Sequence, residues 1–194
     1  MAGEYFALIE KALTEAFVKE EQSLRKLFDT GDDDEWGEFR AEMDIVEHSF
    51  EDDLIPSHRY SFVVLLHVLL ETTLRSVCLE IQKERGLSIS LGDLAGSPMD
   101  KVHKFLTKVV GCSVPSEWNQ LRNLQVVRDC IVHTHGLVKD SRDKESLTKL
   151  ASQGDGLAIN QDDRLVIEPQ FCTTNLNHLK DFFAALFLQI GWEK

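Results

Sequence analysis

The sequence shows no secretory-leader pattern at its start and no long uninterrupted hydrophobic run, so we expect no leader. Its start, MAGEYFALIEKALTEAF, carries acidic residues within an apolar pattern, whereas a secretory leader has a basic region followed by an unbroken apolar stretch. The longest apolar run, residues 62–70, is interrupted by His67 and is far shorter than the roughly 20 residues that cross a bilayer. We therefore expect a cytoplasmic protein with no membrane partner.

Paired cysteines are also missing. The four cysteines are widely spaced and include no Cys-x-x-Cys pair: Cys78, Cys112, Cys130 and Cys172. Such spacing is typical of a reducing compartment with separate, mostly buried thiols. Disulfide bonds are therefore not expected.

Metal-binding patterns are equally scarce. A carboxylate-bridged di-iron bundle needs Glu-x-x-His pairs on two helices, and the sequence contains none. A zinc site built from Cys130, His133 and His135 is the alternative. Because two histidines two residues apart on a helix point about 200° away from each other, they would share one ion only if the helix had already ended. We expect no metal and no cofactor.

The chain has little basic charge, with 21 Lys and Arg against 33 Asp and Glu and a formal net charge of −12. This balance ordinarily counts against a nucleic-acid partner, because affinity for phosphates comes largely from lysine and arginine. The acidity is confined to residues 1–55, which contain 17 acidic and 5 basic side chains, since residues 56–194 contain 16 of each. An RNA partner is therefore not excluded for the larger part of the chain.

Helical periodicity dominates the first half. Apolar residues at helical spacing predict an amphipathic helix over residues 3–28, followed by an acidic loop at 29–34 whose aspartates can cap the next helix. A second helix is predicted over 35–50, and Pro56 is expected to prevent its continuation. Ser57 can cap a third helix over 58–84. Its segment FVVLLHVLL is apolar on every side, which predicts the central, most buried helix.

The second half predicts shorter elements. A short helix is expected over 99–110, and a longer one from about Pro115 to Gly136. A polar connection is expected to be mobile and to contain some helix of its own. It precedes two β-prone runs, LAI and RLVIEP, that flank the turn NQDD and predict a hairpin. A final helix is expected over 174–191.

The fold class that follows is all-α, a bundle of five to six helices with a small β-hairpin before the last helix. We expect a single domain over residues 1–194. Residues 1–55 would form an acidic N-terminal helical pair, and residues 57–190 a bundle core.

The stretch RDCIVHTHG, residues 128–136, carries the chemically most suggestive side chains. With Arg128 at 0° on a helical wheel, Asp129 falls at roughly 100°, Arg122 at roughly 120° and His133 at roughly 140°, opposite the apolar residues. Arg128 and His133 are separated by about 7.5 Å of helical rise, so that one phosphodiester could contact both. His135, about two turns beyond Arg128, is expected to return to this face.

These residue types suit RNA cleavage by the RNA's own 2′-hydroxyl. That reaction needs a base for the hydroxyl proton, an acid for the leaving oxygen and a cation for the charge that grows on phosphorus. Histidine titrates near neutral pH and suits the first two tasks. Arginine is always charged and suits the third, so the reaction requires no metal.

The pattern from Arg128 to His133 resembles the R-x4-6-H motif of the HEPN superfamily of helical-bundle RNA-processing and toxin proteins. The polar residue that usually follows the motif arginine is Asp129 here. The segment LLHVLLETTL, residues 65–74, resembles the apolar helix that bears a glutamate in many members, with Glu71 in that role. The resemblance covers roughly residues 57–190 and implies a HEPN-like bundle.

The resemblance also implies a function. Active members are metal-independent endoribonucleases in which two protomers bring their motif helices together, so it implies an RNA substrate and a homodimer. Many are toxins or defence factors, which implies an antitoxin or another regulatory protein as a possible partner. Catalytic roles would go to Arg128, His133 and Asp129, and supporting roles to the remaining polar residues: Glu71, His135 and Arg122.

One departure from the family concerns His135. Some antitoxin-regulated members have a tyrosine two positions after the motif histidine, where a partner nucleotidyltransferase modifies it. Histidine occupies that position here. That mode of control therefore does not apply at this residue.

Structural interpretations compete with the catalytic one. Arg128 could be a surface arginine, and His133 could interact with the last helical carbonyls. Glu71 could pair with Arg75 one turn on, and His67 is expected to be a hydrogen-bonded core histidine. The rival function is a non-catalytic dimerisation or protein-interaction module.

Basic side chains close to the motif could form a modest rim for RNA. Charges on the outside of helices more often serve solubility alone. The residues concerned are Lys101, His103, Lys104, Lys108 and Arg122.

Overall fold

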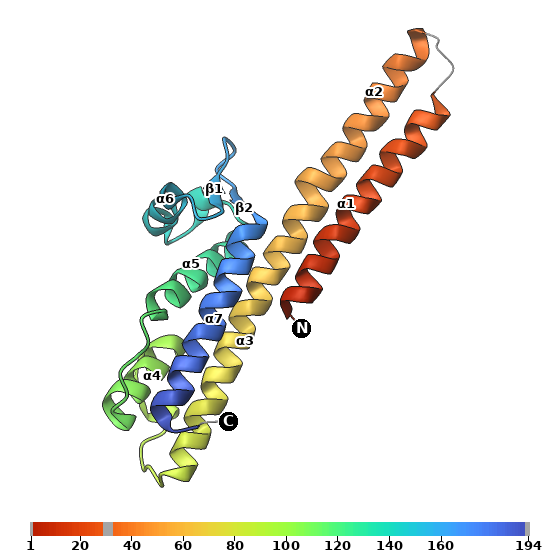
Figure 1. Ribbon diagram of the computed structural model, residues 1–194. Coiled ribbons are helices and arrows are strands. Elements are labelled where there is room, and N and C mark those ends of the chain that lie inside the picture. The colour runs from red at the N-terminus through yellow and green to blue at the C-terminus, as the bar shows by residue number, and fades with distance from the viewer. Residues whose placement is uncertain (1, 29–32, 193–194) are drawn as a thin grey trace. The chain divides into compact units, whose positions relative to one another are not determined.

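The structure, a computed structural model, describes residues 2–28 and 33–192. Within these residues the chain is an all-α bundle with a small two-stranded hairpin before the last helix, which confirms the predicted fold class (Figure 1). Segments marked η are π-helical or 3₁₀-helical. The elements are α1 (Ala2–Leu27), α2 (Asp33–Glu47), η1 (His48–Leu54), α3 (Ile55–Glu84), η2 (Leu91–Asp93), α4 (Pro98–Lys104), η3 (Phe105–Val110), α5 (Trp118–Thr134), η4 (Val138–Asp140), α6 (Lys144–Gln153), β1 (Leu157–Ile159), β2 (Leu165–Ile167) and α7 (Pro169–Ile190).

The chain divides into two compact units, Met1–Phe62 and Val63–Lys194, with the boundary inside α3. In the N-terminal unit, α1 and α2 pack through a small apolar cluster: Leu24, Phe39 and Met43, with Phe28 and Val46 against it. Most of the predicted acidic loop at 29–34 lies outside the described residues, and α2 begins at Asp33.

Pro56 does not end a helix, and the prediction of a stop there was wrong. The chain is helical without a break from Trp36 to Glu84. From His48 to Leu54 the helix is in π register, and the Ile55 N–H donates to the Phe50 carbonyl five residues back. In a regular α-helix the ring of Pro56 would clash with the carbonyl four residues earlier. The wider π turns before it relieve that clash.

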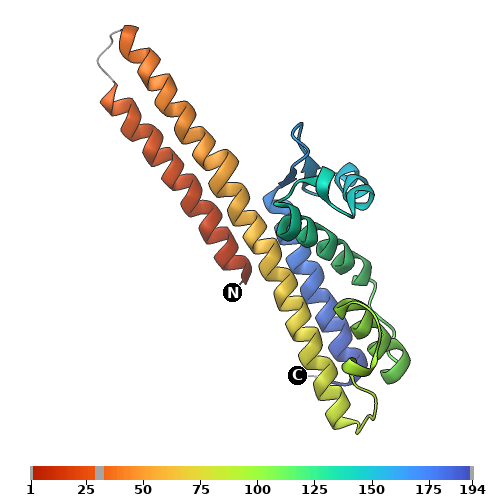
Figure 2. The ribbon, with the colours of Figure 1, turned by 180° about the vertical axis from the view of Figure 1, so that it is seen from behind.

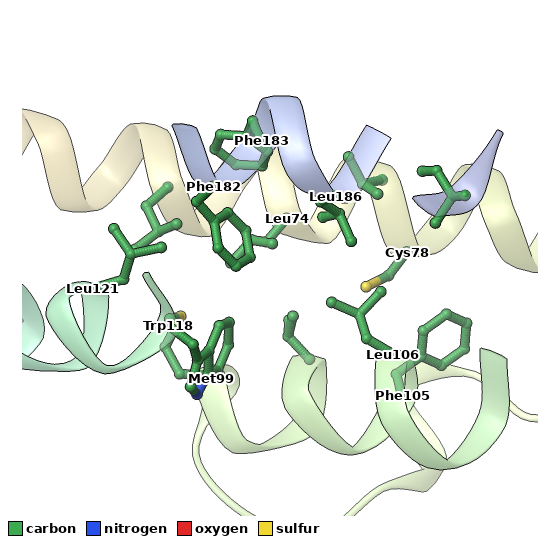
Figure 3. Packing of buried hydrophobic residues seen from close by; sticks show 14 of the residues in the cluster. Leu74, Cys78, Met99, Phe105, Leu106, Trp118, Leu121, Phe182, Phe183 and Leu186 are labelled. Atoms are coloured by element: carbon green, nitrogen blue, oxygen red, sulfur yellow. The ribbon is translucent and has the colours of Figure 1, made fainter. Parts of the chain in front are cut away.

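The core of the C-terminal unit lies between α3, the α4–η3 segment, α5 and α7. Figure 3 shows Leu74 of α3, Phe182 and Leu186 of α7 and Leu106 of η3 pointing toward one another. At one end of the bundle, Trp192 Nε1 donates to the Glu84 carboxylate at 2.9 Å. Arg85 also donates to the Ile190 carbonyl, at 3.4 Å. Figures 1 and 2 show α3 and α7 side by side above this joint.

The α3 helix, predicted to be the central and most buried one, is buried on one face, although its segment FVVLLHVLL is apolar on every side. Its inner face includes fully buried leucines such as Leu66, Leu70 and Leu74. The opposite face exposes apolar side chains to between 39% and 50%: Leu65, Val68, Leu69 and Leu79. Uncovered apolar surface of this kind often marks a contact site.

The helix from Trp36 to Glu84 matches a membrane span by length and composition. It contains an 18-residue window with a mean hydropathy of 1.8, of which 44% is buried inside the protein. A core helix of a water-soluble bundle is also strongly apolar, because one face packs inside.

The hairpin has the predicted position and fixes the end of α5. β1 and β2 are antiparallel, with Leu157 opposite Ile167. The Leu165 N–H donates to the Gly136 carbonyl, and the Val138 N–H to the Asp163 carbonyl. The chain that leaves α5 is therefore held against the hairpin.

Candidate functional site

The helix α5 presents its polar residues on one side because its apolar residues anchor the other. Six of its side chains are buried: Trp118, Leu121, Leu124, Val127, Cys130 and Ile131. Arg128 and Asp129 remain about one quarter exposed, and His133 is exposed. The arrangement follows the predicted wheel.

Arg128 is held by its neighbour. Its Nη1 donates to Asp129 Oδ1 at 2.7 Å. Its Nε is buried and has no hydrogen-bond partner among the described residues. A buried guanidinium nitrogen without a partner is costly, and such a group often marks a functional site.

His67 belongs to the same cluster, although the sequence predicted a hydrogen-bonded core histidine. It is 1% exposed, and neither ring nitrogen has a hydrogen-bond partner within the described part of the chain. Its Nδ1 lies 3.6 Å from the Oε2 of Glu71, one turn further along α3. The i, i+4 spacing in HVLLE could have indicated this pair; the involvement of α5 could not be seen in the sequence.

The electrostatics of His67 link α3 to α5. Burial lowers the pKa of His67 below its ordinary value, and the Glu71 carboxylate partly opposes that shift. The positive charge of Arg128 lowers the pKa further, and Asp129 raises it. Burial outweighs the carboxylates, so His67 is neutral at neutral pH.

His133 lines a small pocket of about 170 Å³ together with Asp129. The other walls come from Thr134, the last residue of α5, and from the chain that follows: Asp140, Ser141, Arg142 and Asp143. The sequence placed this segment in a connection expected to be mobile, and its return toward α5 was missed. The pocket brings one arginine and three carboxylates close to the motif histidine.

His135 does not continue the polar face of α5. The helix ends at Thr134, and His135 adopts the left-handed conformation with φ of 53°. The wheel argument for its side chain therefore does not apply. Its carbonyl accepts a hydrogen bond from Arg164 at 3.1 Å, so the residue joins the helix end to the hairpin.

Arg122 is committed to α4. Its Nη1 lies 2.6 Å from Asp100 Oδ1, and Asp100 also forms a capping box with Ser97. Hydrogen bonds from the Ser97 hydroxyl and then from Arg122 lower the pKa of Asp100 to about 2. In the predicted basic rim, Lys104 likewise donates to the Ala95 carbonyl.

Glu71 forms no ion pair with Arg75 in the described residues, which differs from the structural alternative. Its carboxylate faces His67 on one side and lines a pocket of about 490 Å³ on the other. Glu71 therefore reaches the Arg128–Asp129 pair only through His67.

The candidate zinc ligands do not converge. Across residues 2–28 and 33–192, no three His, Cys, Asp or Glu side chains are placed to hold one metal ion. Cys130 is buried and its Sγ lies 3.4 Å from the Thr134 hydroxyl, whereas His133 points to solvent.

Comparisons of the chain with family models, with curated proteins and with solved structures found no match. The site is therefore interpreted from its own geometry: an arginine fixed by an aspartate, a buried neutral histidine behind it, and an exposed histidine beside the same aspartate.

Proposed function

We propose that the protein is a metal-independent endoribonuclease of the HEPN type. The observation that supports this most strongly is the joint placement of Arg128, Asp129 and His67, two of which carry buried polar atoms without partners. Buried polar groups are almost always hydrogen-bonded in proteins. A cluster that departs from this rule often marks a functional site. The exposed quarter of the Arg128 side chain, next to the exposed His133, is the part that would contact a phosphodiester.

The proposed reaction assigns each residue one task. One His133 takes the proton of the ribose 2′-hydroxyl, and the oxygen attacks phosphorus. The bond from phosphorus to the 5′-oxygen breaks, and a second protonated imidazole supplies the proton to that oxygen. Arg128 holds the phosphate and the charge that develops on it. The products are a 2′,3′-cyclic phosphate and a free 5′-hydroxyl.

A homodimer would supply the second imidazole. In such a dimer the motif helices of two copies line one groove, so that His133 of one copy can act as base and His133 of the other as acid. The exposed apolar face of α3 offers a surface for self-association, but it lies opposite the face that packs toward α5, so the shared groove requires a separate contact along α5. Asp129 and Glu71 would position Arg128 and His67, respectively, and no cofactor takes part.

A toxin or defence role held in check by a regulatory partner is part of this proposal. The acidic residues 1–55 offer a surface for such a partner, because their 17 carboxylates complement a basic protein. The same charge would repel RNA from this part of the chain and leave the C-terminal unit to bind it.

The test is cleavage of mixed RNA by the purified chain in EDTA. We expect cuts that end in 2′,3′-cyclic phosphates, and a loss of about 100-fold or more for His133→Ala and for Arg128→Ala. His178→Ala and Lys180→Ala on α7 are matched controls that should retain activity. Intact RNA with the wild-type chain, or equal cutting by all variants, would refute the proposal.

The second candidate is a non-catalytic interaction module. The uncovered apolar face of α3 favours it, because an exposed apolar surface can bind a partner without any catalytic residue. This candidate predicts a stable dimer that leaves RNA intact in the same assay.

A further inference from the structure

A pocket of the C-terminal unit lies between α3 and the chain leading into α4. It has a volume of about 490 Å³, within the range of small-molecule sites. Its apolar wall consists of side chains from η2 and α4: Leu91, Pro98, Met99 and Val102. Its polar groups on α3 are Glu71, Thr72 and Arg75.

The wall opposite α3 is held in shape by local hydrogen bonds. Capping boxes join Ser90 to Asp93 and Ser97 to Asp100. Lys104 Nζ donates to the Ala95 carbonyl at 2.6 Å between them. The pocket is therefore preformed, which lowers the entropic cost of binding a ligand.

Two cations and one carboxylate line this pocket. The side chains of Arg75 and Lys101 have no hydrogen bond or ion pair with other described residues. Glu71 adds one negative charge, so the three groups together carry +1 in a chain of −12. Arg75 and Lys101 can thus bind an anion, while the Glu71 carboxylate can accept hydrogen bonds from another part of the same ligand.

We propose that this pocket binds a guanine nucleotide unit. The phosphate would contact Arg75 and Lys101, and the planar base would pack against Leu91 and Pro98. An ionised carboxylate only accepts hydrogen bonds. Guanine is the RNA base with two adjacent donors, N1–H and N2–H, on its pairing edge. Glu71 can accept both at once, and no other base offers this match.

Glu71 connects the pocket to the candidate catalytic cluster. Its Oε2 lies 3.6 Å from His67 Nδ1, and His67 responds to Arg128 and Asp129. His67 would then be the only residue between a base bound at Glu71 and Arg128, the arginine proposed to hold the scissile phosphate. The RNA form of this proposal rests on the proposed nuclease function; binding of a free nucleotide does not.

The direct test is calorimetric titration of the full chain with GMP, AMP, CMP, UMP and inorganic phosphate. We expect GMP to bind most tightly, by roughly 5- to 150-fold over the other bases. In Glu71→Gln the side-chain amide offers one donor and one acceptor, a pair that each of the four bases can match, so the preference for GMP over AMP, CMP and UMP should be lost. Lys101→Ala should weaken all four nucleotides alike and leave their order unchanged.

Other outcomes decide against the proposal. Equal binding of the four nucleotides, binding of phosphate as tight as GMP, no binding, or an unchanged order in Glu71→Gln would each overturn it. Circular dichroism of Glu71→Gln establishes that the variant is folded, and Lys101→Ala provides a separate measurement at the proposed phosphate end of the pocket.

A 2′-O-methyl pentanucleotide with one guanosine separates the two sources of the ligand. Tighter binding than GMP indicates a subsite for RNA, whereas weaker binding indicates a free nucleotide, and either supports the guanine pocket. GMP binding by a chain that cuts no RNA would remove the nuclease proposal alone. RNA cleavage without any GMP binding would remove the pocket proposal alone.

Discussion

Arg128 and Asp129 are consecutive residues of α5, yet the arginine Nη1 donates a 2.7 Å hydrogen bond to the aspartate Oδ1. Neighbouring residues on a helix do not face each other. The arginine side chain must therefore turn along the helix surface to reach its partner. This turn keeps the guanidinium beside Asp129, which also lines the His133 pocket.

The proposed function predicts that Asp129→Ala slows RNA cleavage by roughly tenfold to a hundredfold through kcat, because a misplaced arginine no longer holds the phosphate correctly. KM should change little. Asp129→Asn keeps one acceptor oxygen and should lose less. Single-turnover and steady-state rates on one RNA measure both values, with Asp181→Ala on α7 as the control. An unchanged kcat would contradict a positioning role for Asp129.

His67 predicts a dependence of stability on pH. Its folded-state pKa is lowered, so the unfolded chain binds a proton at a higher pH than the folded one. Above the unfolded pKa of about 6.5 both forms are neutral and the residue adds no slope. As the pH falls below that value, the free energy of unfolding should decrease by at most about 1.4 kcal/mol per unit from this group.

Urea unfolding at pH 7.5, 6.5, 5.5 and 5.0 measures this slope. The groups that face His67 are Glu71 on α3 and Arg128 and Asp129 on α5. His67→Gln should flatten the slope, while His178→Gln should leave it as in wild type. If the free energy of unfolding depends on pH in His67→Gln as it does in wild type and in His178→Gln, the pKa of His67 is not lowered by folding.

Gly156 and Gly154 form a matched pair for testing the fold near the hairpin. Both have positive φ, of 76° and 79°. A Cβ on Gly156 would lie 2.7 Å from the backbone nitrogen of Phe171 at the start of α7, whereas one on Gly154 would meet nothing within 4 Å. Gly154→Ala should cost about 1 kcal/mol from its backbone conformation alone. Gly156→Ala should cost more, because a backbone atom cannot move aside easily.

Denaturant unfolding of the two variants gives the difference directly. Equal losses would mean that the chain between α6 and β1 shifts freely away from α7. At low denaturant both variants should have the same circular dichroism spectrum as the wild type, because both should still be folded.

The elements that could be predicted from the sequence are those specified by local patterns. The hairpin at 157–167 follows from turn chemistry. The end of the helix predicted over 99–110 agrees with the left-handed Gly111 that caps η3. Pro56 shows the limit of such reasoning. Its effect on the backbone was recognised, but a π-helical adjustment absorbs it, and that depends on packing along the whole helix.

The candidate site divides in the same way. The shared face of Arg128, Asp129 and His133 follows from helical geometry within one element. The approach of His67 to Arg128 depends on how α3 packs against α5. The α4 partner of Arg122 and the return of 140–143 toward His133 depend likewise on tertiary structure. Sequence spacing alone carries no information on such contacts.

The exposed apolar face of α3 predicts that the protein is a homodimer at micromolar concentration. A two-fold interface uses the same face of both copies, so one substitution places two charges in it. Val68→Glu should therefore convert the dimer to a monomer, because burying an unpaired carboxylate is costly. Multi-angle light scattering after size exclusion measures the mass of each form, for which one chain is 22.1 kDa.

Leu188→Glu is the matched control, because Leu188 on α7 is 66% exposed and Val68 is 42% exposed. It should remain dimeric. Because this face of α3 lies opposite the one that packs toward α5, an interface there does not form the composite groove, and the Val68→Glu monomer should cut RNA as the wild type does while its circular dichroism stays unchanged. A monomeric wild type that cuts RNA would argue against a shared groove and leave each chain to supply both the acid and the base. A dimer that persists in Val68→Glu would place the interface on another face.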